Sequence, residues 1–133
     1  MLNRMGNVRN PYQGKYKRVL CVCSAGMLRS PTAALVLSQE PFNFNTRSCG
    51  IDKEFALIPL DEVLLAWADE IVVMNTSQEI DIRKLSQKTI INLQIEDNYE
   101  YRDKGLMYLI KKHYEEKIWM IKVYYVLCFG KNL

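Results

Sequence analysis

A cysteine and an arginine separated by five residues are the pair best suited to chemistry in this chain. Cys23 ends a short apolar run, and Arg29 follows a loop of small and apolar residues. A thiolate is a strong nucleophile, and a guanidinium offers a planar fork that matches two oxygens of a phosphate. The spacing therefore predicts that Cys23 attacks a phosphate group held by Arg29. The alternatives are a structural buried cysteine and a solvated arginine, and the joint placement of the two residues favours chemistry.

The position of the loop strengthens this prediction. Arg18–Cys23 reads as a buried strand, while Ser30 and Pro31 are typical of the cap and first turn of a helix. Backbone N–H groups at a helix N-terminus can surround a dianion, and the same positive environment favours the thiolate form of Cys23. Ser30 is predicted to donate its hydroxyl to that thiolate. The residues predicted to bind phosphate are Ser24, Ala25, Gly26, Met27 and Leu28, with Gly26 able to adopt a positive φ.

A carboxylic acid follows the predicted fourth strand, where it can face the cysteine loop. Asp97 is predicted to protonate the leaving group and then to activate water. Asp103 is expected to cap the next helix and is the alternative acid. Tyr99 and Tyr101 alternate with acidic residues and are predicted to wall a slot for an aryl phosphate, with simple packing as the alternative. His113 is interpreted as structural, so neither a metal site nor a cofactor is expected.

The elements that must position these residues alternate regularly along the chain. Strands are predicted at 18–23, 44–49, 70–74 and 89–95. A first helix is predicted at 31–39, and a third begins at the capping box Thr76-x-x-Glu79. The second helix begins at Pro59 and has Leu60, Val63, Leu64 and Trp67 on one face. The fourth helix follows loop 96–103 and is marked by Leu106, Leu109, Ile110 and Tyr114. This order predicts an α/β fold, a doubly wound four-stranded parallel sheet with helices on both faces and a phosphate-binding loop after strand 1. Ligands bind such sheets at the carboxyl ends of the strands.

Composition and charge limit the classes of protein. The chain has 133 residues, 49% hydrophobic and 25% charged, which fits one globular domain and excludes wholesale disorder. The net charge of +3 is too small to indicate nucleic-acid binding, and no apolar run reaches the length of a membrane span. Residues 1–18 hold five basic residues and no acid, so 1–16 is predicted to be a flexible basic leader and 17–133 the single domain. Without a signal-peptide pattern a cytoplasmic location is expected, and the four cysteines are expected to be thiols.

The apolar stretch 118–129 fits this scheme poorly. It could extend the last helix, add an edge strand, or cover an apolar surface of a partner. The sequence leaves these three interpretations of the apolar tail, 118–133, open.

The segment VLCVCSAGMLRSPTAALVLS resembles the phosphate-binding loop and first helix of low-molecular-weight protein tyrosine phosphatases. It is closer still to a small bacterial branch of predicted phosphatases with SPTA after the arginine. Over about residues 17–117 three further segments are similar to family motifs: Arg47–Gly50 to the SAG turn, Trp67–Met74 to AD-x-I-x-V-M, and Leu93–Tyr99 to L-x-I-x-D-x-Y.

The resemblance implies cysteine-dependent hydrolysis of phosphotyrosine or an aryl phosphate, on a protein or a small molecule, through a phosphocysteine. By position, Cys23 is the nucleophile, Arg29 the phosphate clamp, Ser30 the thiolate donor and Asp97 the acid. Phosphate and vanadate are expected to inhibit.

Three positions depart from the family pattern: Gly26 replaces an asparagine, Leu28 a second loop cysteine, and Asn98 a proline. These departures bear on the rate and on redox regulation more than on the type of reaction. Three other functions are alternatives. The string CSAGM also resembles the loop of phosphotransferase-system IIB phosphocarriers, although those loops generally lack the closing arginine. Arsenate reduction on the same fold needs relay cysteines, for which Cys49 and Cys128 have no persuasive spacing. A degenerate anion-binding module without turnover is the third.

Overall fold

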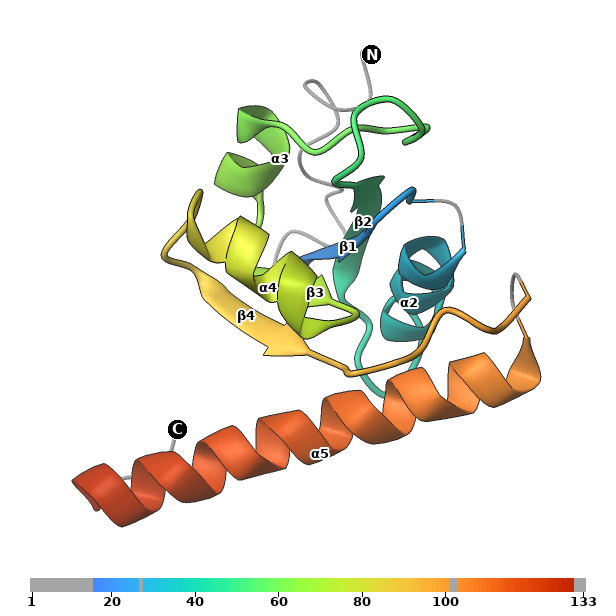
Figure 1. Ribbon diagram of the computed structural model, residues 1–133. Helices are drawn as coiled ribbons and strands as arrows, with labels where there is room; N and C mark the ends of the chain where they lie inside the picture. Colours follow the sequence, from blue (N-terminus) through green and yellow to red (C-terminus); the bar gives the residue numbers. More distant parts are fainter. Residues whose placement is uncertain (1–15, 27, 101–102, 131–133) are drawn as a thin grey trace.

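The structure is a computed structural model that describes residues 16–26, 28–100 and 103–130. Its centre is a four-stranded sheet in the order β2-β1-β3-β4, and all neighbouring strands are parallel (Figure 1). The strands are β1 (Arg18–Cys23), β2 (Asn45–Gly50), β3 (Glu70–Val73) and β4 (Thr89–Asn92). β1 and β3 are the central strands and are almost wholly buried, as their unbroken apolar runs require when both faces of a sheet are covered. The predicted fold class is confirmed.

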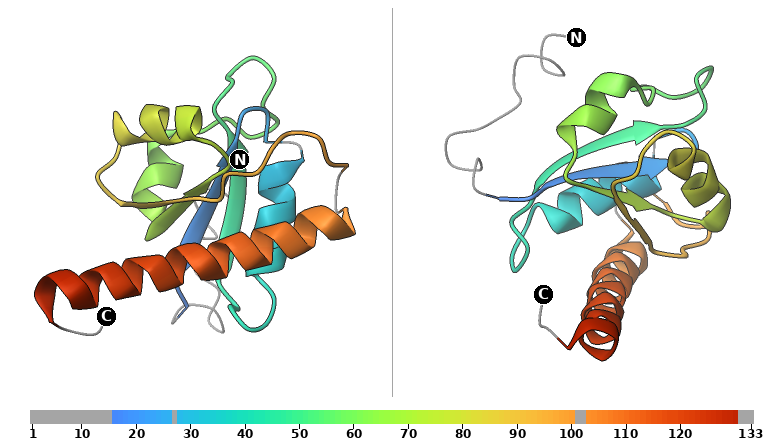
Figure 2. Two further views of the ribbon diagram at one scale, coloured as in Figure 1. Left: turned by 60° about the horizontal axis from the view of Figure 1, so that its bottom comes forward. Right: turned by 90° about the vertical axis from the view of Figure 1, so that its left-hand side faces the viewer.

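Two layers of helices cover the sheet (Figure 2). α2 (Arg29–Leu37) and α5 (Lys104–Phe129) pack on one face, and α3 (Glu62–Trp67) and α4 (Thr76–Arg83) pack on the other. Side chains of β1 alternate between the layers, because successive residues of a strand point to opposite faces. Val19 and Cys21 join the cluster with α2 and α5, whereas Leu20 and Val22 join the cluster with α3.

The helix starts differ from the predicted ones because other residues provide the caps. Ser30 does not cap α2, which begins one residue earlier, and Leu28 at the cap position makes no side-chain hydrogen bond. Asp61 caps α3 by accepting from the Leu64 N–H at 2.9 Å, so the helix does not open at Pro59. Asn75 rather than Thr76 caps α4, since its side chain accepts from the Gln78 N–H at 2.9 Å.

Three further details correct or confirm the predicted elements. β4 ends at Asn92 rather than Ile95, because Gln94 has a φ of +55° and leaves the extended conformation. The Leu93 and Ile95 N–H groups still donate to the Val73 and Met74 carbonyls, at 3.0 and 2.9 Å. Val63 is 40% exposed, so it does not share the buried face of Leu64 and Trp67. Asp103 accepts from the Leu106 N–H at 3.1 Å, which confirms it as the cap of α5.

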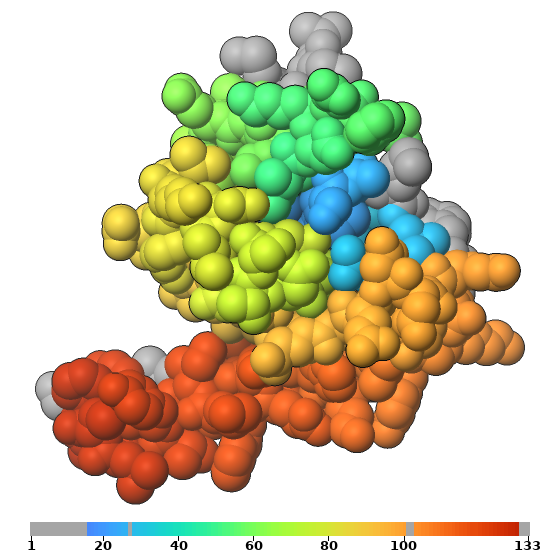
Figure 3. Space-filling view, in the orientation of Figure 1, coloured from blue at the N-terminus to red at the C-terminus, as the bar shows by residue number. Residues whose placement is uncertain are grey.

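α5 is a single helix of 26 residues that includes the whole stretch 118–129. This rules out the edge-strand interpretation and confirms that the stretch extends the last helix. Leu106, Ile110 and Tyr114 attach α5 to the body, and its second half projects beyond the sheet (Figures 1 and 3). Among the described residues, no helix combines the length and the apolar character needed to cross a membrane.

Candidate active site

Cys23 is the last residue of β1, and its sulfur is almost completely enclosed by the loop that follows. The Gly26 N–H donates to Cys23 Sγ at 3.1 Å, and the Cys23 thiol donates to Ser30 Oγ at 3.1 Å. The Ser30 hydroxyl in turn donates to the Cys49 carbonyl at 3.2 Å. The Gly26 N–H and the N-terminus of α2 both present partial positive charge on the side of this sulfur. One backbone donor and one hydroxyl thus hold the sulfur beneath the loop.

The loop turns tightly because two glycines let its backbone lie directly against β2. Gly26 has a φ of +70°, which confirms the predicted positive φ, and a Cβ there would lie 2.8 Å from the Gly50 nitrogen. A Cβ on Gly50 would lie 2.6 Å from the Ala25 carbonyl carbon. The sequence places Gly50 in the segment similar to the SAG turn, but it does not show that this glycine lies against the cysteine loop.

Carbonyl groups on both sides of the loop are held from outside. The Ile51 and Asp52 N–H groups donate to the carbonyls of Cys23 and Ser24 at 3.0 and 2.8 Å. At the far end, the Thr32 N–H and hydroxyl both donate to the Leu28 carbonyl. Since C=O and N–H point in opposite directions across a trans peptide, these contacts also fix the orientation of the N–H groups that follow the three carbonyls.

Gln78 is a site residue that the sequence did not reveal. It lies on α4 with only 2% of its surface exposed, and its Nε2 donates to Ser24 Oγ at 3.2 Å. Its Oε1 accepts from the Met74 N–H at 2.8 Å, so one buried amide joins the end of β3 to the cysteine loop. A polar residue on the buried face of a helix is the signal that could have identified it.

Arg29 links the cysteine loop to the acidic loop after β4. Its side chain is buried, and Nη1 donates to the Ile95 carbonyl at 2.8 Å. Nε lies 3.5 Å from Asp97 Oδ1. Asp97 is 68% exposed, so this ion pair adds little to stability, but it brings the predicted acid to the predicted clamp.

A cavity of about 560 Å³ opens at this edge of the sheet. It is lined by Ser24, Arg29, Met74, Asn75, Thr76, Gln94, Ile95, Glu96 and Asp97. Three predicted site residues, Ser24, Arg29 and Asp97, thus share one cavity although 73 positions separate the first from the last. Within the part of the chain that the structure describes, no three His, Cys, Asp or Glu side chains cluster as metal ligands.

The other thiol of β1 differs from Cys23. Cys21 is completely buried in the core, and this burial raises the pKa of its thiol well above the ordinary value. Cys21 is therefore an unreactive core residue, as its position in the strand predicts.

Comparison with solved structures identifies the fold. The chain superposes on the tyrosine phosphatase Wzb from Escherichia coli K30 in complex with phosphate, with a TM-score of 0.58, 15% identity, and 76% of this chain and 95% of that chain covered. The YwlE arginine phosphatase from Geobacillus stearothermophilus superposes with a TM-score of 0.55 and 19% identity, and the match covers 80% of this chain and 96% of that chain. For the low-molecular-weight protein tyrosine phosphatase from T. tengcongensis the TM-score is 0.56 and the identity 17%, and the match covers 79% of this chain and 97% of that chain.

This chain has the low-molecular-weight phosphatase fold. The comparison confirms the architecture that the sequence motifs imply. Neither a protein-family description nor a curated protein matches the sequence.

Not every predicted site residue reaches the cavity of this phosphatase fold. Tyr99 packs against the cluster formed with α2 and α5 and is not among the lining residues, so the structure does not bring it to the site. Cys23 lies beneath the loop at 4% exposure, while its neighbour Ser24 forms part of the wall. Met27 and Tyr101, like residues 1–15 of the predicted leader, lie outside the described residues.

Proposed function

We propose that this protein is a cysteine-dependent phosphomonoester hydrolase acting through a phosphocysteine intermediate. The observation that carries the proposal is the enclosed sulfur of Cys23, which accepts a hydrogen bond from the Gly26 N–H in the loop before α2. The buried Arg29 is the first residue of that helix. Phosphatase activity also agrees with the solved structures that share the fold.

The first step transfers the phosphoryl group to the enzyme. The loop N–H groups and Arg29 hold the phosphate oxygens, and the Cys23 thiolate attacks phosphorus as the bond to the leaving oxygen breaks. Because Asp97 lies 3.5 Å from the guanidinium that binds the phosphate, its protonated carboxyl is within reach of the leaving oxygen. The products are a phosphocysteine, the Asp97 carboxylate and the neutral alcohol or phenol.

The second step returns the enzyme to its starting state. The Asp97 carboxylate takes a proton from water as that water attacks phosphorus, and the sulfur–phosphorus bond breaks. Ser30 Oγ, at 3.1 Å from Cys23 Sγ, can then turn its hydroxyl from the Cys49 carbonyl to the departing thiolate. Inorganic phosphate leaves, and phosphate and vanadate compete for the same loop.

For the substrate we propose phosphotyrosine or a related aryl phosphate, of a protein or a small molecule. The solved structures with this fold include tyrosine phosphatases and one arginine phosphatase. Two carboxylates, Glu96 and Asp97, line the cavity, and such a lining also suits a cationic leaving group like guanidinium. A parallel assay with aryl phosphate and phosphoarginine distinguishes the two classes.

The buried Arg29 and the adjacent Asp97 favour hydrolysis over the phosphocarrier function, because a carrier needs no acid for a leaving alkoxide. We also propose a cytoplasmic location, where a catalytic thiol stays reduced. Among the described residues, Cys21, Cys23, Cys49 and Cys128 form no disulfide.

The decisive experiment is hydrolysis of para-nitrophenyl phosphate in the presence of a chelator. We expect activity in the wild type, none in Cys23→Ser, and wild-type activity in the matched control Cys128→Ser, whose thiol is exposed at the end of α5. Acid quenching should trap a phosphorylated protein only where Cys23 is present. Turnover by Cys23→Ser would overturn the proposal, and so would loss of wild-type activity in the presence of the chelator. A trapped phosphoenzyme without turnover would indicate a phosphocarrier. Vanadate binding without a phosphoenzyme and without turnover would indicate a degenerate anion-binding module.

A further inference from the structure

The buried amide of Gln78 has an orientation that its two partners determine. One end of the amide faces the Met74 N–H at 2.8 Å, and an N–H needs an acceptor, so this end is the oxygen Oε1. The NH₂ group therefore faces Ser24 and donates to its hydroxyl oxygen at 3.2 Å. The backbone N–H of Gln78 is held as well, because it donates to the Asn75 side chain at 2.9 Å. Gln78 is thus a fixed hydrogen-bond donor directed at Ser24.

The Ser24 hydroxyl keeps a proton that it can donate. A hydroxyl accepts and donates, and Gln78 uses only the accepting side. None of the described residues accepts a hydrogen bond from this hydroxyl. Ser24 is exposed and lines the cavity of about 560 Å³ together with Arg29. Because the amide N–H repels the hydroxyl proton, that proton points away from the buried Gln78 and toward the exposed side, where the cavity lies.

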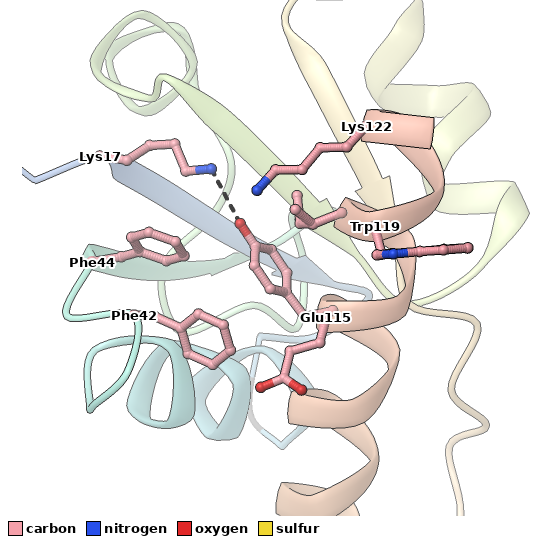
Figure 4. Close-up of a pocket in the computed structure, with 8 residues that line it drawn as sticks. Lys17, Phe42, Phe44, Glu115, Trp119 and Lys122 are labelled. Carbon is pink, nitrogen blue, oxygen red and sulfur yellow. Dashed lines mark hydrogen bonds between the residues drawn. The ribbon is translucent and has the colours of Figure 1, made fainter. Parts of the chain in front are cut away.

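A second cavity, of about 480 Å³, contains a hydroxyl in the opposite situation (Figure 4). The Tyr114 hydroxyl accepts from Lys17 Nζ at 3.1 Å and donates to Glu70 at 2.7 Å. Both sides of this hydroxyl are used within the protein, as expected for a structural group. The Ser24 hydroxyl differs from it, since only its accepting side is used and its donating side faces a cavity.

We propose that Gln78 is a positioning residue that directs the Ser24 hydroxyl toward an oxygen of the bound phosphate. The inference rests on the proposed function, in which the Cys23 loop and Arg29 hold that phosphate. Ser24 directly follows Cys23 and shares the cavity with Arg29, so an anion held by the guanidinium lies in the same space as the hydroxyl. The hydroxyl then adds a charge-assisted hydrogen bond to those from Arg29 and the loop N–H groups.

The orientation of this hydroxyl matters because a serine side chain can present either its proton or its lone pairs to a ligand. A lone pair that faces an anion is repelled by it, so a hydroxyl that must first reorient binds the anion more weakly. Gln78 removes this choice from the Ser24 side chain. The Ser24 carbonyl accepts from the Asp52 N–H at 2.8 Å, so both the backbone and the side chain of Ser24 are held before an anion arrives.

Binding of inorganic phosphate, measured by titration calorimetry, tests the role of the hydroxyl. We expect Ser24→Ala to raise the dissociation constant by about tenfold, which is the scale of one hydrogen bond to a charged group. Ser24→Thr keeps a hydroxyl at the same position and should stay within about threefold of the wild type. Phosphate binding by Ser24→Ala at wild-type strength, or an equal loss in both variants, would overturn the proposal.

A double-mutant cycle tests whether Gln78 acts through Ser24. Gln78→Met keeps a side chain of similar size and should raise the dissociation constant for phosphate by about fivefold. In the Ser24→Ala background the same change should have an effect of less than about twofold, because the hydroxyl that Gln78 directs is already absent. A merely structural role, through the Met74 N–H, would weaken binding equally in both backgrounds and would overturn the proposal. The matched control Gln87→Met changes an exposed glutamine after α4 and should bind phosphate like the wild type.

Thermal unfolding verifies that each variant is folded at the temperature of the titration. If Gln78→Met does not fold, Gln78→Glu replaces it in the cycle, because a carboxyl group still accepts from the Met74 N–H. The effect of the added charge appears in both backgrounds and cancels in the coupling.

Hydrolysis of para-nitrophenyl phosphate, measured in parallel, separates this inference from the proposed function. A wild type without turnover would refute the proposed hydrolysis, while the phosphate titrations would still test the Ser24 hydroxyl. Normal turnover, with equal effects of Gln78→Met on phosphate binding in both backgrounds, would refute only the positioning role of Gln78.

Discussion

At the scale of single residues, the neighbouring side chains of Arg29 and Asp97 have distinct roles in the proposed mechanism. Arg29 is buried and fixed by the Ile95 carbonyl, so its guanidinium is oriented before any substrate arrives. Asp97 is largely exposed and can exchange protons with solvent between the two proposed steps. In the proposed mechanism, Arg29 therefore provides geometry and Asp97 provides a proton.

Asp97→Asn should slow phosphorylation most for poor leaving groups. A phenolate of high pKa needs a proton in the transition state, so loss of the acid should cost about 10²- to 10⁴-fold there and far less for activated esters. The measurement is the phosphorylation rate across a series of substituted phenyl phosphates. Asp103→Asn is the matched control, because asparagine caps α5 as well as aspartate does. A leaving-group effect confined to Asp103→Asn would make that residue the acid.

Arg29→Lys should nearly abolish hydrolysis although it keeps the positive charge. Lysine cannot provide the planar fork, and it also loses the oriented contact between Nη1 and the Ile95 carbonyl. Steady-state kinetics with vanadate inhibition should show lower kcat/KM and weaker inhibition together. Arg83→Lys changes an exposed arginine on α4 and should behave like the wild type. An active Arg29→Lys enzyme would show that the clamp assignment is wrong.

At the scale of elements, the cysteine loop depends on contacts from three neighbouring segments. β2 lies against its glycine, the segment after β2 holds two carbonyls, and Gln78 of α4 holds Ser24. These contacts preorganise the loop, which is what anion binding by backbone N–H groups requires.

Gly26→Ala should damage the loop through both backbone strain and a clash. The added Cβ meets the Gly50 nitrogen at 2.8 Å, in addition to the cost of a positive φ. We expect weaker phosphate binding by calorimetry and a lower midpoint of thermal unfolding. Gly130→Ala isolates the strain, because Gly130 has a φ of +66° with no atom near the added Cβ. Equal losses of thermal stability in both variants, with phosphate binding intact, would show that the close approach of Gly26 to β2 is unimportant.

At the scale of the whole molecule, a buried polar cluster joins α5 to the amino ends of the strands. Burial and the neighbouring Glu70 raise the pKa of the Tyr114 phenol above its ordinary value. The folded chain therefore holds this proton more tightly than the unfolded chain. The resulting stabilisation is complete below about pH 10, the ordinary pKa of tyrosine, and is lost as the pH rises above it.

Tyr114→Phe should reduce this alkaline loss of stability. At pH 7 the variant should be less stable, since Glu70 and Lys17 lose a partner, at a cost of about 1–3 kcal/mol. Urea unfolding between pH 7 and 11 should then show a shallower decline than in the wild type. Tyr108→Phe removes an exposed hydroxyl and should follow the wild-type curve. If Tyr114→Phe and the wild type decline in parallel, Tyr114 does not control the pH dependence.

The sequence by itself determined the parallel α/β architecture, and it pointed to Ser24, Arg29 and Asp97, which the structure brings to one cavity. Apolar runs of strand length alternate with helical periodicity, and Cys23, Arg29 and Ser30 lie within eight positions, so local spacing fixes their relation. The position of Asp97 beside Arg29 could also be predicted, because parallel strands bring successive loops to one edge of the sheet.

Only the tertiary structure decided which contacts complete the site and whether 118–129 is helix or strand. The closeness of Gly26 to Gly50, the bond from Gln78 to Ser24 and the position of Tyr99 all join segments distant in sequence, and no local pattern specifies such packing. Likewise, 118–129 is apolar except for Lys122, so the spacing of its hydrophobic residues could not distinguish a helix from a strand. Its continuation of a helix already anchored by Leu106, Ile110 and Tyr114 resolved that choice. Extending an existing helix adds one hydrogen bond per residue without a new nucleation cost.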